Sequence, residues 1–78
     1  MSKNNILVVE DEAIVSKDIQ QSLKKLGYNI VGAADTGVKA IELAGDKKPD
    51  LVLMDIMLKG DMSGIEAADN IKEQYNIP

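Results

Sequence analysis

The chain has 78 residues and a formal net charge of −4, with neither cysteine nor histidine. Its length allows one small domain, and the missing residue types exclude disulfide bonds, thiolate metal sites and histidine-based acid–base catalysis. All nine basic residues are lysines without a marked cluster, so the sequence predicts no nucleic-acid interface. No apolar run approaches the roughly 18 residues of a membrane span, and no signal-peptide pattern is present, so we expect a cytoplasmic protein.

The first strand and helix are predicted from an apolar run followed by a helical stripe. NILVV, residues 5–9, is continuous and β-branched, which is typical of a strand covered on both faces. Gly27 is suited to end the helix that follows. The apolar residues that recur at helical spacing before it are Val15, Ile19, Leu23 and Leu26.

Two further strand–helix units follow. NIVGAA, residues 29–34, reads as a second, shorter strand, and Asp35 or Thr36 can cap a helix that ends at Gly45. LVLMD is a third apolar strand that ends on Asp55, and SGIE then supplies a capping box for a third helix. The residues predicted to face inward from these two helices are Val38, Ile41 and Ala44, then Ile65, Ala68, Ile71 and Tyr75.

This alternation, β-α-β-α-β-α, indicates an α/β fold with a parallel sheet and helices on both faces. Right-handed crossovers of the simplest doubly wound kind give the sheet order 2-1-3. Such sheets bind ligands at the carboxyl ends of their strands, where the winding direction changes, here between strands 1 and 3. Strand 1 leads into Glu10 and Asp11 and strand 3 ends in Asp55, so we expect these acids to meet.

Three carboxylates in one crevice repel one another unless a cation lies among them. Oxygen ligands select a hard ion such as Mg²⁺, and the backbone carbonyl of Met57 could add a ligand whatever its side chain. Asp55 suits a nucleophile that forms an aspartyl-phosphate, because it ends the central buried strand, whereas Glu10 and Asp11 suit metal binding. The alternative is that Glu10, Asp11 and Glu12 only favour a helix N-terminus electrostatically.

The segments ILVVEDE, PDLVLMDIML and GDMSGIEAA, in this order and spacing, resemble the receiver domain of response regulators in two-component signalling. The resemblance spans all 78 residues and implies a flavodoxin-like fold in which Asp55 accepts a phosphoryl group from a histidine kinase. It also implies that Glu10, Asp11, Asp55 and the Met57 carbonyl hold Mg²⁺. A receiver is a phosphoacceptor module and not an enzyme, beyond its own phosphorylation and dephosphorylation.

Two features depart from the family pattern. Lys59 stands where family members often carry a proline, and KGDMSG looks one residue longer than usual, which we expect to change the shape of the loop and not its chemistry. The family continues, in the order 2-1-3-4-5, with strands that add a Ser or Thr and a Lys to the phosphoryl site. Residues 1–78 are therefore expected to be an incomplete receiver of three β-α units, with impaired phosphotransfer.

Two alternatives belong to other classes. A haloacid-dehalogenase-like phosphatase also uses an Asp at a strand end, but it requires a second Asp two residues later, where this chain has Met57. The structural alternative is a self-associating fragment without signalling activity. Strand 3 would present an open edge without strands 4 and 5, and Leu51 to Met54 contain no charge or proline that would discourage pairing. We therefore expect a two-fold homodimer through strand 3.

Overall fold

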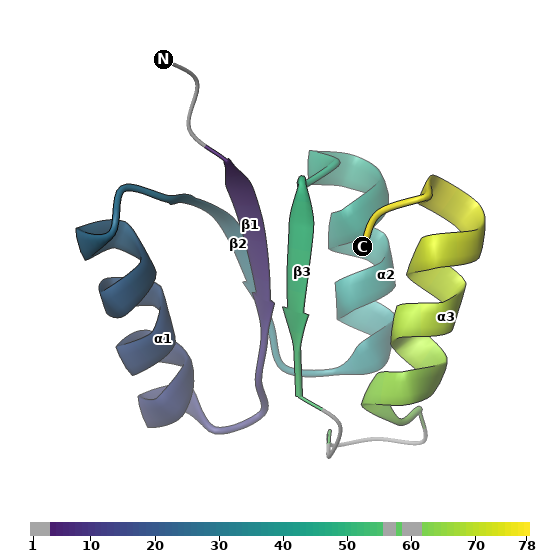
Figure 1. Ribbon diagram of the computed structural model, residues 1–78. Helices are drawn as coiled ribbons and strands as arrows, with labels where there is room; N and C mark the ends of the chain where they lie inside the picture. The colour runs from purple at the N-terminus through teal and green to yellow at the C-terminus, as the bar shows by residue number, and fades with distance from the viewer. Residues whose placement is uncertain (1–3, 56–57, 59–61) are drawn as a thin grey trace.

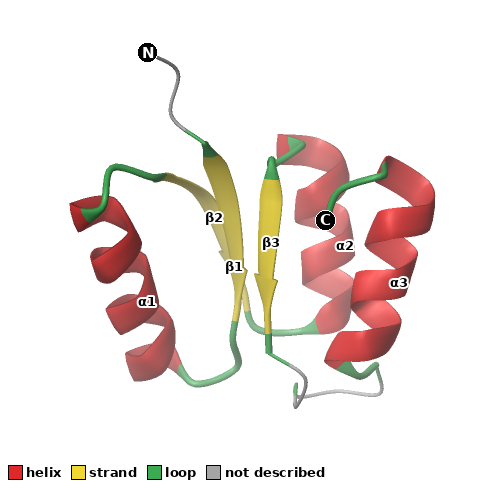
Figure 2. Ribbon diagram, viewed as in Figure 1, coloured by secondary structure: helices red, strands yellow, loops and turns green. Residues whose placement is uncertain are grey.

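The computed structural model describes residues 4–55, 58 and 62–78. Its elements are β1 (Asn5–Val9), α1 (Ala13–Lys25), β2 (Asn29–Ala34), α2 (Gly37–Lys47), β3 (Leu51–Met54) and α3 (Gly64–Tyr75). The strands form a parallel sheet in the order β2-β1-β3, with α1 on one face and α2 and α3 on the other (Figure 1, Figure 2). The predicted α/β fold and the 2-1-3 order are confirmed. Within the described residues, no helix combines the length and apolar character needed to cross a membrane.

The buried core cluster lies between the sheet and helices α2 and α3. Side chains alternate along a strand, so Leu7 and Val9 of β1 point into this cluster while Ile6 and Val8 face α1. All four are at most 2% exposed, as expected of a central strand covered on both faces. The buried members of the cluster are Leu7, Val9, Ala34, Ala40, Ala44, Ile71 and Ile77.

Helix α2 continues past its predicted end at Gly45. Its last residue is Lys47, and Lys48 adopts a left-handed conformation, with φ of 46°, before Pro49. Gly45 has a packing role instead, because a Cβ atom there would lie 2.5 Å from the Tyr75 hydroxyl oxygen on α3. The prediction assigned this glycine to a helix end, and contact between two helices overrides that local preference.

The predicted inward faces of α2 and α3 are correct at some positions and wrong at others. Ala44 and Ile71 are buried and Ile41 and Tyr75 pack against the core cluster, as predicted, whereas Val38, Ile65 and Ala68 are exposed. Val38 and Ile65 are 58% and 59% exposed, whereas the glycine before each of them is buried. Small residues allow close packing against neighbouring elements, and the large side chains beside them point outward. The buried residues have the same spacing in both helices: Gly37, Ala40 and Ala44 in α2, and Gly64, Ala67 and Ile71 in α3.

Helix α1 covers only part of its face of the sheet. It packs on β1 and β2, where Ile19 and Leu23 are half-buried, but Val15 and Leu26 of the predicted stripe are 38% and 73% exposed. The same face of the sheet is open over β3, where Leu51 and Leu53 are 40% and 39% exposed. The chain therefore has one closed layer of core and one that is partly open.

Strand β3 is the outer strand of the described sheet, but its edge is not bare. The Val52 N–H donates a hydrogen bond to the Pro78 carbonyl oxygen at 3.0 Å, and the neighbouring Ile77 is buried in the core cluster. Figure 1 shows the C-terminal residues returning from α3 to the side of β3. The prediction that the edge of this strand is open is therefore wrong at Val52.

Candidate functional site

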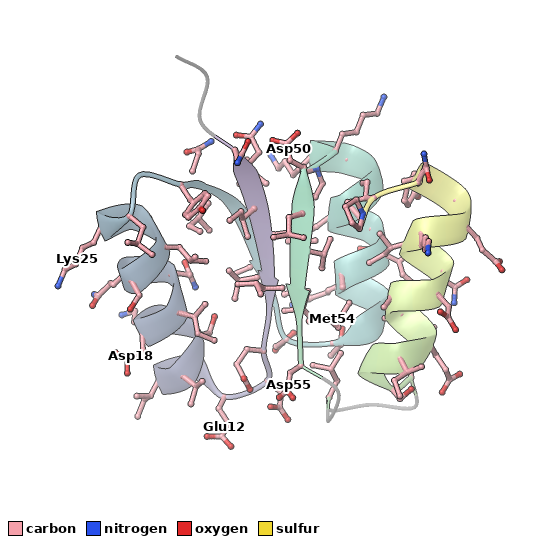
Figure 3. The ribbon with its side chains drawn as sticks, viewed as in Figure 1. Glu12, Asp18, Lys25, Asp50, Met54 and Asp55 are labelled. Carbon is pink, nitrogen blue, oxygen red and sulfur yellow. The ribbon has the colours of Figure 1, made fainter. Side chains whose placement is uncertain are left out.

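Backbone hydrogen bonds fix the two acidic strand ends in register. The Glu10 N–H donates to the Ala34 carbonyl oxygen at the end of β2, and the Asp55 N–H donates to the Val9 carbonyl oxygen of β1, both at 3.0 Å. Figure 3 shows Asp55 where the chain leaves β3, at the same end of the molecule as Glu12, which precedes α1. Parallel pairing thus delivers acids from two neighbouring strands to one edge of the sheet.

The carboxylates of Glu10, Asp11 and Asp55 lie together at this edge. One oxygen from each residue lies within 4.8 Å of the others, and all three residues are half-buried. Mg²⁺ binds oxygen at about 2.1 Å, so two oxygen ligands of one ion are about 3 to 4.2 Å apart. The three carboxylate oxygens would therefore need to move only slightly closer together to bind one ion. Oxygen-only donors also match this hard cation. The predicted fourth ligand, the Met57 carbonyl, lies outside the described residues.

Glu10 connects the acidic cluster to helix α1. Its Oε2 atom accepts a hydrogen bond from the Glu12 N–H at 3.1 Å. This N–H has the largest single influence on the Glu10 pKa and lowers it, but loss of hydration and the carboxyls of Asp11 and Asp55 together outweigh it. The pKa of Glu10 is therefore raised above its usual value, as expected where acidic groups crowd together.

The metal-free chain should become less stable as the pH rises through the raised pKa of Glu10. The folded chain keeps the Glu10 proton to a higher pH than the unfolded chain does. The proton therefore stabilises the fold up to that pKa, and this contribution disappears above it. Glu10→Gln should remove this part of the pH dependence. Urea midpoints over a pH series measure the difference, with exposed Glu12→Gln as the control, and equal slopes for wild type and Glu10→Gln would contradict the prediction.

Among the residues that the structure describes, two lysines lie beside Glu10 and Asp11 of the acidic cluster, although the sequence pattern did not single them out. A shallow cavity of about 370 Å³ is lined by Glu10 and Asp11 together with Lys17 of α1 and Lys39 of α2. Lys39 Nζ lies 3.7 Å from a carboxylate oxygen of Asp35, and both side chains are largely exposed. Each lysine is close to a helix N-terminus, and in this fold those termini lie at the carboxyl ends of the strands. Their position near the start of a predicted helix was the feature of the sequence that could have identified these two lysines.

The loop after Asp55 is described at only some of its residues. Leu58 packs against the core cluster, and the Met62 side chain lies so close to Gly37 that an added Cβ atom would be 3.0 Å from Met62 Sδ. Lys59, where the sequence departs from the family pattern, lies outside the described residues. The described ends of the loop are thus packed against the sheet and α2.

Comparisons with known proteins agree on one family. A model of the response regulator receiver domain matches residues 6–78. The transcriptional regulatory protein PdtaR of Mycobacterium tuberculosis is 42% identical over 73 residues, which are 94% of this chain and 35% of that protein. The chain spans about a third of the length of the curated relatives it matches.

Solved structures show the same similarity. The solution structure of the PhyR receiver domain from Erythrobacter litoralis has a TM-score of 0.91 and 38% identity, covering 100% of this chain and 60% of that one. A crystal structure of the anti-anti-sigma factor PhyR with the anti-sigma factor NepR, from Bartonella quintana, has a TM-score of 0.89 and 37% identity. That match covers 97% of this chain and 31% of the PhyR chain.

Proposed function

The chain belongs to the response regulator receiver domain family, and on this premise we propose that it is a Mg²⁺-dependent phosphoacceptor module with Asp55 as the acceptor. The observation that carries the proposal is the meeting of the Glu10, Asp11 and Asp55 carboxylates at the ends of two neighbouring parallel strands. A family assignment gives the class of protein, and the residues of the site must supply the chemistry. The assignment replaces the haloacid-dehalogenase-like alternative.

Asp55 is the proposed nucleophile. One of its carboxylate oxygens forms a bond to the phosphorus of a phosphohistidine in a histidine kinase while the P–N bond breaks, and the departing imidazole takes up a proton from solvent. Glu10, Asp11, Asp55 and the Met57 carbonyl are the residues proposed to hold Mg²⁺, which offsets the negative charge of the phosphoryl oxygens. Half-burial strengthens these electrostatic interactions relative to bulk water. The chain acts as a signalling module in the cytoplasm and not as an enzyme on other substrates.

We further propose that residues 1–78 form the first three β-α units of a larger receiver. The support is that the whole chain matches only 60% of the isolated Erythrobacter litoralis receiver domain. In addition, Pro78 already pairs with Val52 at the edge of β3, where a fourth parallel strand would begin. PhyR forms a complex with an anti-sigma factor, and for this chain too we propose that the signal passes to a protein partner.

A Mg²⁺ titration followed by NMR tests the site. Amide shifts should concentrate at residues 10–12 and 55–58, with weak affinity. Asp11→Asn should abolish these shifts, because a carboxylate ligand at close range is lost. Asp46→Asn is the matched control, since it removes an exposed carboxylate in the last turn of α2, outside the cluster, and should leave the titration unchanged. Shifts spread evenly over the surface acids would argue against a specific site.

Self-association is a second candidate function, favoured by the open face of β3. Leu51 and Leu53 are partly exposed there, and contiguous apolar surface commonly marks an interaction site. The strand-edge homodimer stays a prediction, and it requires the Pro78 contact with Val52 to give way. Val52 itself is unsuitable for a test, because its side chain packs against the core.

Sedimentation equilibrium with Leu53→Lys tests self-association, with Ile65→Lys as a control of equal chemistry at an exposed position on α3. If the dimer uses β3, its dissociation constant should rise at least about tenfold in Leu53→Lys, because a charge without a partner is costly to bury in the interface. The dissociation constant should stay unchanged in Ile65→Lys. Concentration-dependent protection of the Met54 amide from hydrogen exchange would place the edge in the interface. A concentration-independent monomer would exclude this function for the chain.

A further inference from the structure

The N-terminus of α1 is capped differently from those of α2 and α3. In α2, Thr36 Oγ1 accepts a hydrogen bond from the Lys39 N–H, and in α3 Ser63 Oγ accepts one from the Glu66 N–H, both at 3.2 Å. The N-cap residue of α1 is Glu12, and its side chain accepts no such bond. The first turn of α1 therefore lacks the stabilisation that an N-cap side chain usually provides.

The backbone N–H of an N-cap residue is a second donor that helix ends satisfy. In α3 this donor belongs to Ser63, and the Glu66 side chain accepts it at 3.4 Å to complete a capping box. The equivalent position of α1 is Val15, which has no side-chain acceptor. In α1 the acceptor is instead Glu10, which precedes the N-cap residue, because its Oε2 accepts the hydrogen bond from the Glu12 N–H.

This hydrogen bond closes a short turn around Asp11. The backbone of Glu10 is held at the end of β1 by its N–H bond to Ala34, and the side chain of Glu10 holds the start of α1. Asp11 lies between these two fixed points, with a carboxylate oxygen within 4.8 Å of those of Glu10 and Asp55. Residues that orient a metal ligand in this way commonly affect metal affinity when they are substituted.

We infer that Glu10 is a positioning residue, whose carboxylate anchors the N-terminus of α1 and so holds Asp11 in place for the cation. The inference rests on the proposed function, because it assigns Glu10 a part in that same site. It differs from a purely electrostatic role, since the Glu12 N–H requires a hydrogen-bond acceptor and not a negative charge. A side-chain amide of the same length keeps an acceptor oxygen, and a methyl group does not.

Glu10→Gln and Glu10→Ala form the matched pair that isolates this role, because both remove the charge and only Gln keeps the acceptor. Amide hydrogen exchange on the metal-free chain is the first measurement. In Glu10→Ala, the Glu12 amide and the first turn of α1 should exchange at least about fivefold faster than in wild type, as expected for loss of a cap. Glu10→Gln should stay close to wild type, and so should Glu12→Gln, which removes a neighbouring charge but keeps the bond.

A Mg²⁺ titration of the same variants is the second measurement. Glu10→Ala should bind Mg²⁺ at least about fivefold more weakly than Glu10→Gln, because Asp11 loses its support. This weaker binding should accompany the faster exchange of the Glu12 amide in the metal-free chain, which direct coordination of the ion by residue 10 would not produce. Equal affinities would overturn the inference and leave Glu10 acting through charge alone. If Asp11→Asn and Asp55→Asn left Mg²⁺ binding unchanged, the proposed function would fail. Hydrogen exchange of the Glu12 amide would then still test whether Glu10 anchors α1. Unchanged exchange in Glu10→Ala would overturn that role.

Discussion

Asp55→Asn should abolish phosphoryl incorporation when the chain, or a longer receiver that contains it, is incubated with a small phosphodonor and Mg²⁺. The variant keeps the size of the side chain but replaces the attacking carboxylate with an amide, which is a far weaker nucleophile toward phosphorus. Asp55 is held at the end of β3 by its N–H bond to the Val9 carbonyl oxygen, so the substitution should leave the local fold intact. Intact-mass spectrometry measures the incorporation, and we expect a decrease of at least about a hundredfold.

Asp46→Asn is the control for this experiment, because it removes an exposed acid in the last turn of α2, outside the cluster, and should leave incorporation unchanged. Chelation of Mg²⁺ should reproduce the loss seen in Asp55→Asn if the acidic cluster works through the ion. A longer receiver should react faster than this chain, since further hydrogen-bond donors would stabilise the phosphoryl charge. Phosphate that still appears in Asp55→Asn, on Ser16 or Thr36 for example, would show that the acceptor is another residue.

The strand ends were predictable because three simple rules determine them. A continuous apolar run of β-branched residues indicates a strand buried on both faces, and alternation with helices indicates a parallel sheet. Right-handed crossovers then place the ends of β1 and β3 side by side. That reasoning needed no side-chain geometry, and the carboxylates of Glu10, Asp11 and Asp55 do lie within reach of one another.

The contacts of helices were harder to predict because they depend on neighbours that are distant in sequence. The stripe of large apolar residues suggested that Val38 and Ile65 face inward, yet close packing favours the glycines beside them. Gly45 looked like a helix end and proved to be the place where Tyr75 approaches α2. The bond between Glu10 and the Glu12 N–H was equally hidden, since the acids alone suggested only charge.

Ile71→Ala should destabilise the chain severely, whereas Ile65→Ala should have little effect. The two isoleucines belong to the same helix, α3, but Ile71 is 1% exposed within the core cluster and Ile65 is 59% exposed. Truncation of a buried Ile to Ala costs about 2–5 kcal/mol, because it removes apolar contacts and leaves a cavity. A domain of 78 residues has roughly 4–12 kcal/mol of stability in total, so Ile71→Ala should leave the fold marginal or lost.

Urea denaturation followed by far-UV circular dichroism measures both variants. Ile65→Ala should change the free energy of unfolding by less than about 0.5 kcal/mol, because its side chain is mostly in water in the folded and the unfolded chain. The contrast depends on the observed orientation of α3, with Gly64, Ala67 and Ile71 inward. If the two variants lost similar stability, α3 would have to be rotated toward the face predicted from its large residues alone. Different residues of α3 would then belong to the core cluster between α3 and the sheet.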